Sequence, residues 1–202
     1  MKIVSKRRKE NMKKHINMDI HIKNLTLSAM FLAIGLLLPF LTGQIQLIGN
    51  MLLPMHIPVL LCGLICGWKY GLGVGFIMPL LRFAIFQMPP IYPTGAAMAL
   101  ELATYGAVVG LLYSKSRYKC IFSLYRSMLA AMISGRIVWG IAEVILLGLG
   151  GKGFTFEAFL AGAFLTAYPG IILQLVLIPS IMIALNRTGL VKFTEKKTVT
   201  EK

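Results

Sequence analysis

Five side chains that could bind a solute or exchange a proton lie inside long apolar stretches of this 202-residue chain. They are His56, Arg82, Glu101, Arg136 and Glu143. A charge in the middle of hydrocarbon costs about 2.5–3.5 kcal/mol on insertion scales, so each charged group needs an opposite charge or a wet cavity. Two interpretations are open: the charges form structural pairs between helices, or they line a polar pocket that holds a ligand.

The chain lacks the motifs of common enzymes. It contains no H-E-x-x-H, no G-x-S-x-G and no Walker sequence, so we expect no ATP hydrolysis, no metal and no cofactor. Cys62 and Cys66 are one helical turn apart with only His56 in the same segment, and we expect them to be small buried apolar residues. An intramembrane enzyme that uses Glu101 or Glu143 with His56 is a less favoured alternative.

The composition indicates a polytopic membrane protein, because 57% of the residues are hydrophobic, 14% are charged and the mean hydropathy is +0.76. A soluble domain of this size is about 45–50% apolar and about 25% charged. We predict an all-α bundle of six transmembrane helices, at 25–42, 54–68, 70–86, 93–113, 122–148 and 158–186. The expected parts are a basic tail (1–24), the helical domain (25–186) and a second basic tail (187–202).

The positive charges predict the topology. Of the 21 Lys and Arg residues, eight lie in 1–24 and five in 187–202, and four more lie in the loop after the fourth span. The connections 43–53 and 87–92 have none. By the positive-inside rule both termini are cytoplasmic. The net charge of +14 therefore marks the ends of the spans, and we do not expect a nucleic-acid partner.

In this topology the ionisable residues lie toward the external side. Arg82, Glu101 and Glu143 fall in the outer half of their helices, and Arg136 lies near the middle. Arg136 and Glu143 share one helix face but are about 10 Å apart along it, so each is expected to meet another helix. Pro54 and Pro58 would place His56 at an outer vestibule. The candidate binding set is His56, Arg82, Tyr92, Glu101, Arg136, Trp139 and Glu143.

Several stretches resemble one known family. They are "AMFLA" (Ala29 to Ala33), "MLLPMHIPVLLCGLICGWKYG", "MPLLRF" and "MPPIYPTGAAMALELATYG". With the size and the six spans, they resemble the substrate-binding (S) components of energy-coupling factor (ECF) vitamin transporters over about 25–186.

The resemblance implies a six-helix subunit of an ABC-type importer in the plasma membrane of a prokaryote. It would bind a vitamin or vitamin precursor near the outer face. It would dock through Ala29 and Ala33 onto a transmembrane coupling subunit that two cytoplasmic ATPase subunits drive. Alanines one turn apart also allow close helix approach on physical grounds alone.

The ligand is chosen by chemistry. Pantothenate is the first choice, because Arg82 or Arg136 could bind its carboxylate. A cobalamin-type precursor, such as a ribazole or benzimidazole, is the second, because Trp139 and Tyr92 could stack on its ring. A stand-alone secondary transporter remains an alternative, although no internal 3+3 repeat is apparent.

Overall fold

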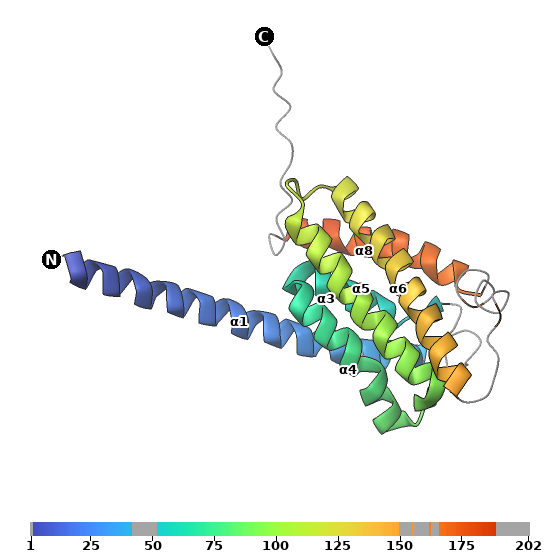
Figure 1. Ribbon diagram of the computed structural model, residues 1–202. Coiled ribbons are helices and arrows are strands. Elements are labelled where there is room, and N and C mark those ends of the chain that lie inside the picture. Colours follow the sequence, from blue (N-terminus) through green and yellow to red (C-terminus); the bar gives the residue numbers. More distant parts are fainter. Residues whose placement is uncertain (1, 42–51, 150–154, 156–161, 163–165, 189–202) are drawn as a thin grey trace, which may run out of the picture.

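The chain folds as a helical bundle with one long helix leaving it (Figure 1). The computed structural model describes residues 2–41, 52–149, 155, 162 and 166–188, and these residues contain no strand. The elements are α1 (Lys2–Leu41), α3 (His56–Cys66), α4 (Trp68–Phe86), the short π-helical turn η1 (Ile91–Gly95), α5 (Ala96–Lys115), α6 (Ile121–Leu149) and α8 (Tyr168–Arg187).

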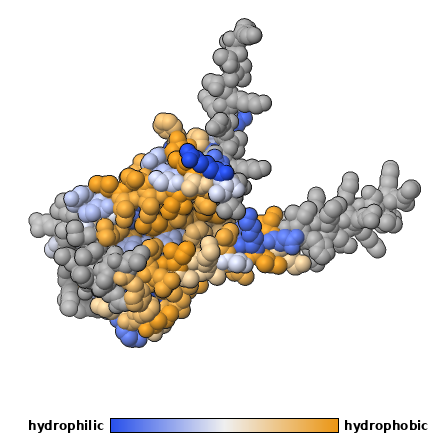
Figure 2. All heavy atoms as spheres, turned by 180° about the vertical axis from the view of Figure 1, so that it is seen from behind, coloured by the Kyte–Doolittle hydropathy of each residue, from blue (hydrophilic) through white to orange (hydrophobic). Residues whose placement is uncertain are grey.

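The prediction of an all-α membrane bundle is confirmed. Among the described residues, five segments are long and apolar enough to cross a bilayer: Met18–Phe40, Trp68–Phe86, Ile91–Lys115, Ile121–Gly148 and Tyr168–Arg187. With 11 residues, α3 is about 16 Å long, which is shorter than the roughly 30 Å of hydrocarbon. The surface over the bundle is predominantly hydrophobic (Figure 2). Such a surface suits lipid contact.

Two predicted boundaries differ from the observed helices. The first helix was predicted from residue 25, yet α1 is one continuous helix from Lys2. The last helix was predicted from residue 158, but Thr166 and Ala167 form a turn and α8 begins at Tyr168. Pro169 explains this start, because a proline fits the first helical turn and disfavours helix before it. Residues 158–161 and 163–165 lie outside the described part.

α6 has one side that faces lipid and another side that faces the bundle. Ile133, Ile137, Ile141 and Ile145 recur every four residues, and each is more than half exposed. Arg136 lies on the opposite side and is buried. The spacing of the apolar residues therefore turns the charged face of α6 inward, where a charge in a membrane protein can be compensated.

Glycines bring α3, α4 and α5 into backbone contact. A Cβ added to Gly71 would lie 2.6 Å from the carbonyl oxygen of Gly106 and 2.7 Å from the Cα of Gly63. Gly75 lies in the same way against the backbone of Leu102. In the sequence "GLGVG" (71–75), Gly71 and Gly75 are one helical turn apart, and both lie on the close-packing surface. Nothing lies within 4 Å of a Cβ added to the intervening Gly73.

This packing predicts opposite effects at two glycines of one helix. Gly71→Ala should lower the unfolding free energy by about 1–3 kcal/mol, because the new methyl group meets backbone that cannot move aside. Gly73→Ala is the matched control and should be neutral or stabilising by up to about 1 kcal/mol, because alanine favours helix. Thermal unfolding of both variants in the same detergent measures the difference. Equal melting temperatures would contradict the close approach of α4 and α5.

Residues 21–24 of α1 are fixed to neighbouring helices by polar contacts. The ring Nδ1 of His21 is 2.8 Å from the hydroxyl of Tyr70, and the side-chain amide of Asn24 donates to the carbonyl of Cys66 at 3.4 Å. The Cys66 carbonyl belongs to the last turn of α3, where carbonyls lack helical partners. Next in the chain is Gly67, whose φ of +95° suits glycine and turns the chain directly into α4. Cys62 and Cys66 are buried, as expected.

Candidate functional site

A buried polar cluster forms where α3, α5 and α6 meet, and Glu101 is its centre. Arg136 Nη1 lies 3.0 Å from the carboxylate oxygen Oε1 of Glu101. The Tyr105 hydroxyl donates to the same oxygen at 3.0 Å, from one turn further along α5. His56 Nε2 is 3.5 Å from it. One carboxylate oxygen thus meets three potential donors from three helices.

The members of this cluster are shielded from the surface. His56 is 0% exposed, Glu101 2% and Arg136 6%. The His56 ring also packs on Tyr105, with 5.1 Å between ring centroids. The sequence predicted that His56 faces an outer vestibule, and this is wrong: Pro54 and Met55 form a turn, α3 begins at His56, and the ring points into the bundle.

Several hydrogen-bonding groups of this cluster have no partner. Within the described residues, Arg136 Nε and Nη2 and both ring nitrogens of His56 have no hydrogen-bond partner. An unsatisfied buried polar group costs about 1–3 kcal/mol, and more when it is charged. Native proteins rarely leave several such groups together unless water, an ion or a ligand satisfies them.

Arg82 is a second buried cation, near the carboxyl end of α4. Its Nε donates to the Met88 carbonyl at 3.2 Å, while its Nη1 has no hydrogen-bond partner in the described part of the chain. Gly75 of α4 lies level with Leu102 of the antiparallel α5. Counting helical rise from that contact separates the Arg82 and Glu101 backbones by roughly 9 Å along the helix axes, with Arg82 nearer the carboxyl end of α4.

The remaining predicted binding residues lie around α6. Glu143 is buried, and it makes no ion pair within the described residues. Trp139 is half-buried, with its ring against Gly162. Tyr92, in η1, is half exposed, and its hydroxyl donates to the Leu146 carbonyl near the outer end of α6.

The two predicted docking residues lie elsewhere. Ala29 and Ala33 are exposed on α1, while Phe31 and Gly35 on the same helix face the bundle. Gly35 lies against the Met78 side chain of α4. The small residues of α1 therefore present a shallow surface on the outside of the bundle, separate from the polar cluster.

Sequence reasoning missed Tyr105 and Gln174. Tyr105 is one turn after Glu101, a spacing that could have revealed it as a hydrogen-bond partner. Gln174 is 1% exposed on α8, and its side-chain nitrogen has no hydrogen-bond partner within the described residues. It is a lone amide in the apolar run "IILQLVLIP", which is a signal of the same kind as the four charges.

The Tyr105 hydroxyl offers a limited test of the cluster. Tyr105→Phe removes the donor to Glu101 while keeping the ring that packs on His56. We expect the unfolding free energy to fall by about 1.5–3 kcal/mol, the usual contribution of a hydrogen bond to a charged group. Thermal unfolding in detergent measures this. Phe31→Leu, which changes a buried ring remote from the carboxylate, separates loss of the hydrogen bond from general loss of packing.

The fold and this site define a class: a multi-pass helical membrane protein with a buried polar cluster among its spans. The chain belongs to the family of ECF transporter substrate-specific components, whose model matches residues 23–185. No significant match to a curated protein or to a solved structure is found. The resemblance inferred from the sequence is thereby confirmed.

Membership of this family establishes the general role. The chain is a substrate-specific membrane subunit of an ECF importer, and the family consists of transport subunits, not of enzymes. Such components generally work with a transmembrane coupling component and with ATPases.

Proposed function

We propose that this chain captures a small vitamin or vitamin precursor carrying a carboxylate, with pantothenate as the first candidate. The observation that carries the proposal is the set of buried guanidinium nitrogens of Arg136 and Arg82 that have no partner in the described residues, with the unpartnered ring nitrogens of His56 beside them. A ligand that satisfies them must bring acceptor oxygens and a negative charge. Pantothenate has a carboxylate at one end and amide and hydroxyl groups along its length.

The placement of the two arginines supports an elongated ligand. Glu101 neutralises Arg136 at the inner end, so the Arg136–Glu101–His56 cluster is suited to uncharged polar groups. Arg82 contacts a backbone carbonyl and makes no ion pair within the described residues. A ligand carboxylate would therefore bind at Arg82, with the amide and hydroxyl groups reaching inward over roughly 9 Å. Tyr92 and Glu143 would line the path between them.

A cobalamin-type precursor, such as a ribazole or benzimidazole, is the second candidate. Trp139 supports it, because this half-buried indole lies on the same face of α6 as Arg136 and is large enough to stack on an aromatic ring. In this case Glu101 or Glu143 would accept hydrogen bonds from the ring system. A stand-alone secondary transporter is the alternative to the multi-subunit importer.

The placement in the cell is part of the proposal. Both basic tails, 1–24 and 187–202, would lie in the cytoplasm of a prokaryote, and the domain 25–186 would cross its plasma membrane. Ala29 and Ala33, both exposed, would contact the coupling subunit that two ATPase subunits drive. Arg82 would then be on the external side, where a nutrient arrives.

Calorimetric titration of the purified protein distinguishes the ligands. We expect pantothenate to bind without ATP and without partner subunits. Arg82→Gln should weaken binding at least tenfold, or about 1.4 kcal/mol, by removing the cation that meets the carboxylate. The matched control is Arg126→Gln, at an exposed arginine near the amino end of α6. This variant should bind pantothenate normally. Tighter binding of a benzimidazole, insensitive to Arg82→Gln, would replace the first candidate by the second.

A further inference from the structure

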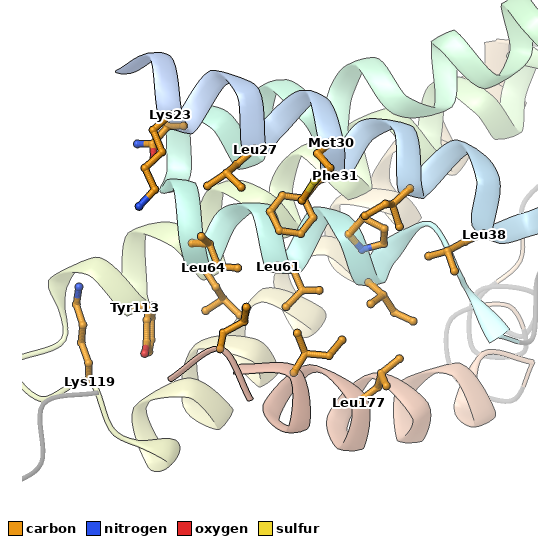
Figure 3. Close-up of a pocket in the computed structure, with 17 residues that line it drawn as sticks. Lys23, Leu27, Met30, Phe31, Leu38, Leu61, Leu64, Tyr113, Lys119 and Leu177 are labelled. Carbon is orange, nitrogen blue, oxygen red and sulfur yellow. The ribbon is translucent and has the colours of Figure 1, made fainter. Parts of the chain in front are cut away.

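A groove on the flank of the bundle is separate from the polar cluster. It runs between α1 and α3 on one side and α8 on the other, with a volume of about 650 Å³ (Figure 3). That volume is within the range of small-molecule sites, about 300–1,000 Å³. Thirteen of its 17 lining residues are apolar. The lining includes none of the cluster residues His56, Glu101 and Arg136.

The apolar part of the groove has the length of one membrane leaflet. On α1 it extends from Leu27 to Leu38, which is about 16 Å of helical rise. The hydrocarbon core of a bilayer is about 30 Å thick, so this length is close to half of it. Leu177 lies on the opposite wall, on α8, and is itself partly exposed (Figure 3).

One end of the groove is cationic. The side chains of Lys23 and Lys119 both lie at this end, beside Tyr113 (Figure 3). Lys119 Nζ is 6.0 Å from the centre of the Tyr113 ring. No carboxylate lines the groove, and neither lysine makes an ion pair within the part of the chain that the structure describes. The two ammonium groups at this end are therefore open to an anionic ligand.

The cationic end is also held in place. Asn24, which lines the groove next to Lys23, donates to the Cys66 carbonyl of α3 at 3.4 Å. His21, one turn earlier on α1, contacts Tyr70 of α4 at 2.8 Å. These contacts fix α1 against α3 and α4 at the entrance. The position of Lys23 relative to the groove is therefore set by the fold.

We propose that this groove binds one anionic phospholipid of the cytoplasmic leaflet. An acyl chain lies along the apolar wall between Leu27 and Leu38, and the phosphate lies between Lys23 and Lys119, which donate charge-assisted hydrogen bonds to its oxygens. The positive-inside topology puts both lysines at the cytoplasmic surface, where anionic lipids attract basic residues. An apolar partner helix in the same groove would leave both ammonium groups without a counter-charge.

Lipid retention tests this proposal. The full chain is incorporated into nanodiscs of equal parts phosphatidylglycerol and phosphatidylcholine, released into mild detergent, and examined by native mass spectrometry. We expect one phosphatidylglycerol to remain bound in clear preference to phosphatidylcholine. The double variant Lys23→Ala/Lys119→Ala should reduce the retained phosphatidylglycerol about tenfold, and its unfolding temperature should be unchanged because both side chains are exposed.

The matched control is Lys115→Ala/Arg117→Ala, which removes two exposed charges near the same end without touching the groove. It should retain phosphatidylglycerol like the wild type. Equal retention of the two lipids by the wild type, or an equal loss in the control, would overturn the proposal. If Lys23→Ala/Lys119→Ala keeps its phosphatidylglycerol but no longer binds the coupling subunit, the groove is the site of a partner helix. This result would also overturn the proposal.

Discussion

Replacing Arg136 by alanine is expected to destabilise the ligand-free protein by about 3–5 kcal/mol and to lower ligand affinity at least as much. The loss of stability follows because the carboxyl group of Glu101, 2% exposed, would be left buried without the guanidinium 3.0 Å away. The loss of affinity follows because two guanidinium nitrogens that we assign to the ligand disappear with the side chain. Thermal unfolding with and without ligand measures both effects.

A double variant separates the structural role of this pair from its role in binding. Glu101→Leu/Arg136→Met removes both charges together, and replacing a buried pair by apolar residues is often neutral or stabilising by about 1–4 kcal/mol. We expect it to fold and to fail to bind. A stable double variant with wild-type affinity would reduce the pair to a structural element and would contradict the site assignment. Arg126→Ala, at an exposed arginine near the amino end of α6, controls for the loss of an arginine in general.

Introducing a tryptophan at Ala29 is expected to abolish uptake while leaving ligand binding intact. Ala29 is exposed on α1, so a larger side chain there does not disturb the bundle. It would, however, hold the coupling subunit away from the helix, because helices in membranes associate closely through small residues. Uptake by vesicles containing the complete transporter and titration of the isolated subunit measure the two properties separately.

Ala84→Trp provides the matched control for Ala29→Trp. Ala84 is also an exposed alanine, but it lies on a different helix, in the last turn of α4. We expect it to transport normally. Normal uptake by Ala29→Trp, or an equal defect in both variants, would show that the outer surface of α1 is not the docking surface.

The sequence was sufficient to predict the fold class, because hydrocarbon demands helices with long apolar runs and leaves few other solutions. It also singled out Glu101 and Arg136, since a charge within such a run needs compensation, and the structure brings the two together. The close contacts at Gly71 and Gly75 have a simple physical basis, because small residues one turn apart allow membrane helices to approach closely.

The partners of each charge could not be predicted from one sequence. Arg136 meets Glu101 on α5, 35 positions away, and only the tilt and rotation of the helices determine that choice. The burial of His56 depends on a turn at Pro54–Met55 that directs the ring inward. The spacing of Pro54 and Pro58 alone had suggested that His56 faces an outer vestibule. Gln174 was overlooked because only residues with a formal charge were considered, and Gln174 is an uncharged amide within an apolar run.

Native mass spectrometry of the purified subunit, with neither ATP nor partner proteins present, tests most directly whether the buried polar residues hold a small molecule. After growth in medium containing pantothenate and the cobalamin precursors, the wild type should carry one such molecule per chain. The folded double variant Glu101→Leu/Arg136→Met should carry none. Equal occupancy of both proteins, or a wild type that stays empty even when incubated with each candidate, would contradict the account.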